Sequence, residues 1–171
     1  MAVVNASYIR RGAIGNERAK DAVRYMQHRP ERKGERVSRP LFGTDGRWER
    51  IHAYRMVDEA PTGTHFYCMS INPDPKAEDH QRDLDLRELT AKTIRTLEKI
   101  VATPVLYVAA EHTEHSNNRR HVYLLASVPR KLNTPELIHL RDSATQAALE
   151  QRHERELRRE AREREGDEWE W

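Results

Sequence analysis

The sequence has almost none of the cysteine that proteins use for cross-linking and for metal binding. Cys68 is the single cysteine among 171 residues, which excludes an internal disulfide and a zinc site built from several cysteines. It lies in the apolar run from Phe66 to Ile71. A buried, unreactive thiol is the role expected there.

Long apolar runs are also missing. No stretch approaches the roughly 20 residues that a membrane-spanning helix needs, and Met1 to Arg11 lacks the apolar core of a secretory signal peptide. We therefore expect a cytoplasmic protein without a membrane partner. Hydrophobic residues make up 37% of the chain and charged residues 34%, which predicts one domain with a small core and a long solvated element.

Positive charge is concentrated near the N-terminus. Met1 to Arg55 contains 13 Lys and Arg against 6 Asp and Glu, a net charge of +7. Leu149 to Trp171 contains 6 against 9, a net charge of −3. A basic N-terminal third suits a surface that meets phosphate groups. An ordinary solvated surface has the same composition, so charge alone does not decide between the two.

The spacing of apolar residues predicts an α+β domain, with a mostly antiparallel sheet, helices packed on one side and a long charged C-terminal helix. Runs of β-branched and apolar residues predict strands at 2–9, 64–71, 105–110 and 121–128. Helical spacing predicts helices at 16–27, 48–58 and 86–101, and another that begins near 134. Residues 31–47 have the composition of a loop.

The last predicted helix loses its apolar face near Leu157 and is almost entirely charged from Arg152 to Arg164. Glu and Arg four residues apart stabilise such an exposed helix. We expect one domain over residues 1–149 and an exposed, charged helical extension and tail over 150–171. A further interpretation makes this extension an oligomerisation arm, but its apolar seam is too thin for a stable coiled coil.

Histidines gather between the last two predicted strands. His112 ends the first strand and His121 begins the second, and Tyr123 shares a face with His121 because side chains alternate along a strand. These three side chains are therefore expected to converge above the sheet. Two imidazoles and one further donor would hold a divalent ion and leave positions open for a phosphate. Otherwise, the histidines would simply be polar residues of a loop.

Together with the N-terminal helix, these residues resemble the nuclease domain of plasmid-mobilising relaxases, which are HUH endonucleases. His112, followed after eight residues by His121-Val122-Tyr123, is similar to their three-histidine motif. The segment Arg18 to Arg29, which contains Tyr25, is similar to their first motif, and the strands and helices follow in the relaxase order. The candidate tyrosine precedes the histidines, unlike in rolling-circle replication proteins and single-tyrosine transposases. The resemblance covers roughly residues 2–149 and makes 1–149 the expected nuclease domain.

The resemblance implies that Tyr25 nicks single-stranded DNA through a 5′-phosphotyrosine link, in the mobilisation of a plasmid or another mobile element. A divalent ion, Mn²⁺ or Mg²⁺, held by His112, His121 and Tyr123 would offset charge on the phosphate. Asp21, one helical turn before Tyr25, would orient the phenol or take its proton. Accessory mobilisation proteins would bind the C-terminal helix. The basic residues expected to grip DNA phosphates are Lys20, Arg24, Arg29, Arg119 and Arg120.

One residue departs from the relaxase pattern. Tyr123 stands where relaxases have their third histidine, and a neutral phenol binds a divalent first-row metal more weakly than imidazole does. His115 or Glu111 could supply the missing donor, or the site could bind metal weakly and nick slowly. The protein could also have lost its chemistry and kept nucleic-acid binding. A catalytically degenerate HUH-fold binding protein is therefore the alternative function.

Overall fold

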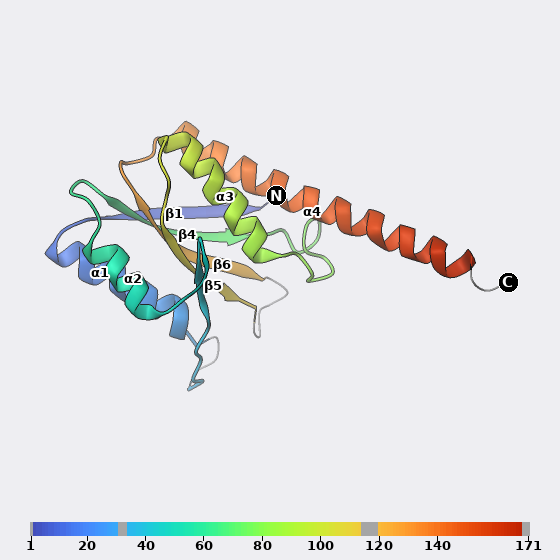
Figure 1. The fold of residues 1–171 in the computed structure, drawn as a ribbon, viewed down its shortest axis with the longest axis horizontal. Coiled ribbons are helices and arrows are strands. Elements are labelled where there is room, and N and C mark those ends of the chain that lie inside the picture. Colours follow the sequence, from blue (N-terminus) through green and yellow to red (C-terminus); the bar gives the residue numbers. More distant parts are fainter. Residues whose placement is uncertain (1, 31–33, 114–119, 169–171) are drawn as a thin grey trace.

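The computed structural model describes residues 2–30, 34–113 and 120–168 (Figure 1). A single six-stranded sheet has the order β1-β4-β6-β5-β2-β3, and all neighbouring strands pair antiparallel. The strands are β1 (Val3–Arg10), β2 (Leu41–Gly43), β3 (Gly46–Trp48), β4 (His65–Asn72), β5 (Tyr107–His112) and β6 (His121–Val128). The helices are α1 (Ala13–His28), α2 (Arg50–Asp58), α3 (Leu86–Val101) and α4 (Thr134–Glu168). The predicted α+β class is confirmed.

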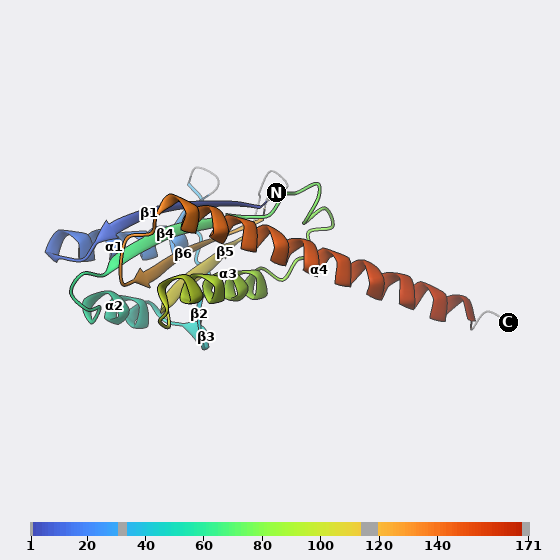
Figure 2. The ribbon, with the colours of Figure 1, turned by 90° about the horizontal axis from the view of Figure 1, so that it is seen from above.

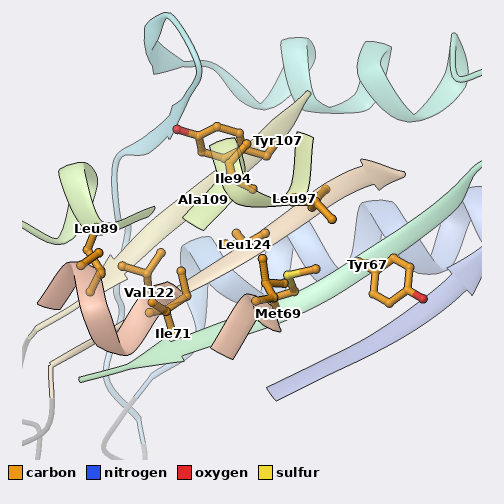
Figure 3. Close-up of a cluster of buried hydrophobic side chains, with 14 of the residues drawn as sticks. Tyr67, Met69, Ile71, Leu89, Ile94, Leu97, Tyr107, Ala109, Val122 and Leu124 are labelled. Atoms are coloured by element: carbon orange, nitrogen blue, oxygen red, sulfur yellow. The ribbon is translucent and has the colours of Figure 1, made fainter. Parts of the chain in front are cut away.

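Helices cover both faces of the sheet, whereas the sequence analysis placed them on one side. The larger core lies between α3, the first half of α4 and one sheet face, which contributes Tyr67 and Leu124 (Figure 3). The smaller core lies between α1, α2 and the opposite face, which contributes Phe66 and Leu125. The central strands β4 and β6 are therefore apolar on both faces, and each face needs a covering layer.

Most predicted elements agree with the structure to within a few residues. The bounds of α3 match the predicted helix, and the Asp85 carboxylate accepts a hydrogen bond from the Glu88 backbone N–H at 3.0 Å, as an N-cap does. The bounds of β6 also match. α3 carries the clearest apolar stripe in the sequence, which explains why its ends could be predicted.

The structure contains a short β-hairpin, β2–β3, where the sequence predicted only a loop. Each strand has three residues, and β2 joins the sheet by pairing with β5. A Cβ at Gly43 would lie 2.5 Å from the Trp48 ring and 2.6 Å from the Tyr107 carbonyl oxygen. The glycine that suggested a loop is thus required by close packing within the hairpin.

α4 is buried in its first half and solvated in its second. Leu140, Ala144 and Ala148 are fully buried, and over residues 134–166 of the helix Arg152 is the last one that is buried. Residues 153–166 are exposed or half-exposed, and this part extends beyond the sheet (Figure 2). The helix continues without interruption through the domain boundary expected at residue 149.

Among the residues that the structure describes, no helix combines the length and the apolar character needed to cross a bilayer.

Candidate functional site

Strands β5 and β6 bring His112, His121 and Tyr123 together on the sheet face that α1 covers. His112 and His121 are directly opposite in the antiparallel ladder, and their ring centroids are 5.0 Å apart. The Tyr123 ring is 4.6 Å from His112 and 5.0 Å from His121. His112 is buried, whereas His121 and Tyr123 are half-buried. These side chains form one aromatic group at the end of the strand pair.

Helix α1 adds Tyr25 to this group. The buried side of α1 packs Ala19, Val23 and Met26 against the sheet, and the Met26 carbonyl oxygen accepts a hydrogen bond from His112 Nε2 at 2.9 Å. Tyr25 is 52% exposed and meets Tyr123 edge to face at 6.2 Å between centroids. Tyr25, His112, His121 and Tyr123 are called the tyrosine–histidine cluster below.

Arg29 links the two tyrosines of the cluster. Its Nη1 donates a hydrogen bond to the Tyr123 hydroxyl oxygen at 3.0 Å, and its guanidinium carbon lies 5.4 Å from the centroid of the Tyr25 ring. Arg29 is exposed and directly follows α1. A permanent cation therefore lies beside both phenols at the solvent-facing edge of the cluster, where it would attract a phosphate group.

The described residues do not fit the three-donor metal site that the relaxase resemblance implies. His112 Nε2 must carry a proton to donate to the Met26 carbonyl oxygen, so a metal could bind this side chain only through its other ring nitrogen, Nδ1. The Tyr123 oxygen accepts a hydrogen bond from Arg29, which a bound cation would oppose. Among the described residues, no group of three His, Cys, Asp or Glu side chains is placed to hold a metal ion.

Of the two residues that could substitute for the third metal ligand, Glu111 is described by the structure and His115 is not. Glu111 precedes His112 in β5, so its side chain points to the opposite face of the sheet. Its carboxylate pairs there with Arg87 of α3 at 3.5 Å. Glu111 is therefore directed away from the cluster. His115 lies outside the described residues.

Two of the predicted site residues on α1 contact α2, and a third pairs with one of them. Lys20 Nζ lies 2.8 Å from the Asp58 carboxylate, and this hydrogen bond raises the pKa of Lys20. Asp21 pairs with Arg24, and Arg24 also donates to the Tyr54 hydroxyl oxygen at 2.7 Å. The contacts of Lys20 and Arg24 hold α1 against α2, Asp21 supports Arg24, and none of these contacts involves the tyrosine–histidine cluster.

Arg120, one of the two predicted DNA-binding arginines before β6, is held in contacts within the fold. Arg120 donates hydrogen bonds to Asp79 at 3.2 Å and to the Leu84 carbonyl oxygen at 3.2 Å, so it fixes the loop before α3. Arg119 lies outside the described residues. Of the predicted DNA-binding residues that the structure describes, Arg29 is the one in contact with the cluster.

A cavity of about 410 Å³ opens beside the cluster on the same sheet face. The cavity was not predicted from the sequence, although the sequence contains a signal for it. Asn5 and Ser7 pair with Ser70 and Cys68, so small residues replace the large apolar ones on this face. The residues that line the cavity are Asn5, Ala6, Ser7, Ala22, Tyr25, Met26, Cys68, Met69, Ser70, Tyr123 and Leu124.

Two charged and polar features mark this cavity. The Asn5 side-chain amide donates to Ser70 Oγ at 3.4 Å, and that of Asn72 donates to the same oxygen at 3.0 Å. Burial raises the pKa of the Cys68 thiol, and the positive charge of Arg18 opposes this rise. Arg18 is exposed on α1, so a second cation lies near the cavity.

Comparison with known proteins finds no match for the chain, whether with a family model, a curated protein or a solved structure. The relaxase resemblance therefore rests on the sequence motifs alone.

Proposed function

We propose that this protein is a relaxase-like nuclease that nicks single-stranded DNA with Tyr25 in the mobilisation of a plasmid or another mobile element. The observation that supports this best is the meeting of Tyr25, from α1, with His112, His121 and Tyr123, from β5 and β6. Tyr25 is half-exposed, whereas Tyr67 and Tyr107 are buried in the other core. An exposed phenol beside imidazoles and an arginine is suited to attack a phosphodiester.

In the proposed reaction, the Tyr25 oxygen attacks the phosphorus atom of a phosphodiester. A bond forms between phosphorus and the phenolic oxygen, and the bond from phosphorus to the 3′-oxygen breaks. The phenolic proton ends on the released 3′-oxygen, and half-buried His121 is the proposed carrier. His112 already donates to the backbone of α1 and acts by fixing Met26, the neighbour of Tyr25.

Arg29 is proposed to offset the negative charge that grows on the phosphate. Its contacts with both tyrosines place a guanidinium at the position where a phosphate would meet Tyr25. The described residues do not by themselves complete a three-ligand metal site, and Arg29 is the group proposed to act on the phosphate charge. If His115 supplies the missing donor, Mn²⁺ or Mg²⁺ would assist the reaction, and a chelator would then inhibit it.

The proposal is tested by incubating the purified protein with a pool of random single-stranded oligonucleotides, with Mn²⁺ or Mg²⁺ and with chelator. A covalent protein–DNA band should appear on a denaturing gel. Tyr25→Phe should abolish this band and leave the affinity for DNA within about twofold of the wild type. Tyr8→Phe, on β1, is the matched control and should retain the band. An adduct that persists in Tyr25→Phe would remove Tyr25 from the mechanism.

The second candidate function is nucleic-acid binding without catalysis on the same fold. One observation favours it: Tyr123 occupies the place of the third histidine, and its oxygen accepts a hydrogen bond from Arg29. It predicts no adduct and a binding affinity that falls steeply with salt and is indifferent to chelator. In either case, the exposed second half of α4 is the proposed surface for accessory mobilisation proteins.

A further inference from the structure

We infer that the cavity beside Tyr25 is a binding site for one unstacked nucleobase of a single strand. This inference rests on the proposed function for the nature of the strand, and it assigns a role to a surface outside the tyrosine–histidine cluster. Three features of the cavity support it: its walls, its position and its charge.

The walls of the cavity suit the two kinds of surface that a base presents. Ala22, Tyr25 and Met26 of α1 supply apolar and aromatic surface, on which the flat face of a base can stack. Ser7 and Ser70 supply small polar groups from neighbouring strands, which can form hydrogen bonds with the edge of a base. The volume of about 410 Å³ lies in the range of small-ligand sites.

The position of the cavity connects it to the proposed reaction. Tyr25 and Tyr123 line the cavity and also belong to the tyrosine–histidine cluster. Arg29 contacts both tyrosines. A nucleotide with its phosphate at Arg29 would therefore find the cavity beside it for its base. Filling the cavity would hold the strand in register with Tyr25.

The charge around the cavity favours a ligand with an anionic backbone. None of the described residues that line it is acidic, and Arg18 and Arg29 lie near it. An apolar small molecule would form no hydrogen bonds with the polar residues of the cavity, Asn5, Ser7 and Ser70. A cationic peptide would be repelled by the two arginines. A base carried on a phosphate backbone satisfies both the polar floor and the basic rim.

The first test fills the cavity with Ser7→Phe. Ser7 is exposed on the edge strand β1, so the larger side chain is compatible with the fold. Binding is measured by fluorescence anisotropy with an oligothymidylate and with an abasic strand of the same length. Ser7→Phe should weaken oligothymidylate binding about tenfold, as the loss of one stacked base does, and leave abasic binding unchanged. Val3→Phe is the matched control, since Val3 lies on the same strand and is 42% exposed.

The second test uses the wild-type protein. Cys68 lines the cavity and is the single cysteine of the chain, so its rate of alkylation by iodoacetamide reports directly on the cavity. Because burial raises the pKa of this thiol, the reaction is followed at mildly alkaline pH. Saturating oligothymidylate should slow alkylation at least fivefold, whereas the abasic strand should leave the rate unchanged.

Equal loss of affinity for both strands in Ser7→Phe, no loss for either, or alkylation unaffected by oligothymidylate would overturn the inference. These results differ from those that would overturn the proposed function. Base-dependent protection of Cys68 without any Tyr25 adduct would keep the base site and remove the nicking activity. A Tyr25 adduct without protection of Cys68 would keep the nicking activity and remove the base site.

Discussion

Tyr123 is the residue at which the candidate site departs most from a three-histidine metal site. Its oxygen accepts a hydrogen bond from Arg29, and its ring packs against Tyr25, His112 and His121. A histidine here would point its ring nitrogens towards two imidazoles. Tyr123 instead holds Arg29 beside the candidate nucleophile, Tyr25. Substitutions of Tyr123 and of Arg29 test the two roles separately.

Tyr123→His should create metal affinity. The centroid of the Tyr123 ring now lies 4.6 Å from that of His112 and 5.0 Å from that of His121. A histidine at position 123 would therefore bring three imidazoles together, and imidazole is a good ligand for divalent first-row metals. We expect the affinity for Co²⁺, measured by calorimetry and by visible absorption, to rise at least about tenfold. Tyr123→Phe is the control and should bind no more tightly than the wild type. Equal Co²⁺ affinities of the His and Phe variants would contradict the expectation.

Arg29→Ala should slow formation of the Tyr25 adduct about hundredfold, because removal of one group that stabilises developing charge commonly costs that much. Arg29→Lys should be intermediate, since lysine keeps the charge but lacks the planar group that reaches both tyrosines. The rate is measured in single-turnover reactions. Arg55→Ala, which removes an exposed arginine from α2, is the control. A similar loss in Arg55→Ala would reduce the role of Arg29 to general attraction of DNA.

At the residue scale, the sequence predicted the group on β5 and β6 and could not predict the partners of α1. Strand alternation alone places His121 and Tyr123 on one face. On a helix, by contrast, the tertiary neighbour decides what a charged side chain contacts. Asp58 and Tyr54 of α2 engage Lys20 and Arg24, and nothing in the spacing of α1 indicates that α2 would lie there.

At the element scale, the position of α1 depends on its close approach to the end of β1. A Cβ on Gly15 would overlap the carbonyl oxygen of Arg10. Gly15→Ala should therefore lower the free energy of unfolding by about 1–3 kcal/mol and reduce adduct formation, because α1 carries Tyr25. Urea unfolding and the adduct assay measure the two effects. Gly166→Ala, also helical but in open space, is the control and should be neutral or slightly stabilising.

The start of α4 carries an acid-sensitive interaction. Hydrogen bonds from Arg130 and from the Asn133 backbone N–H lower the pKa of Glu136 to about 2, against 4.5 for the unperturbed group. Because the pKa of the folded state is depressed, this stabilisation is complete above pH 4.5 and is lost as the pH falls towards 2. Arg130 is half-exposed, so solvent screening limits the contribution to about 1 kcal/mol.

Glu136→Gln should therefore be less stable than the wild type by about 1 kcal/mol at pH 7, and the difference should vanish near pH 2. Glutamine retains the backbone hydrogen bond of the helix start, so the comparison isolates the charge. The free energy of unfolding is measured by urea titration at several pH values. Glu160→Gln, on the exposed part of α4, is the control. A difference that does not change between pH 7 and pH 2.5 would rule out the ionic origin.

Elements with many turns or alternations were predictable from the sequence, and short ones were not. α3 repeats its apolar stripe over 16 residues, whereas β2 and β3 have three residues each and exist through pairing with distant β5. Three residues are too few to show a period. The hairpin is stabilised by its partner strand, which no local pattern around residues 41–48 can indicate.

At the scale of the whole molecule, the two faces of the sheet have different roles. α3 and the buried half of α4 cover one face with the larger core. On the other face, α1 and α2 leave the tyrosine–histidine cluster and the cavity accessible. The sequence could not predict this division, because β4 and β6 are apolar on both faces and alternation alone does not say which helix covers which face.

This division predicts that the end of α4 can be removed without affecting the candidate site. Residues 160–166 are exposed, and exposed pairs such as Arg159 with Glu163 contribute little. Deletion of residues 160–171 should change the free energy of unfolding by less than about 0.5 kcal/mol and leave the rate of adduct formation unchanged. Urea unfolding and the adduct assay measure both quantities.

Deletion of residues 151–171 is the contrasting variant. It removes Arg152, which donates to Asp83 at 2.6 Å and holds the pKa of that carboxyl below its usual range. It also removes Gln151, which bonds the Asp85 backbone at both its N–H and its carbonyl oxygen. The loss should be about 2 kcal/mol or more. Equal stability of the two truncated proteins would show that α4 ceases to support the sheet before residue 151, and an adduct rate that falls with the shorter deletion would mean that the exposed helix takes part in holding DNA.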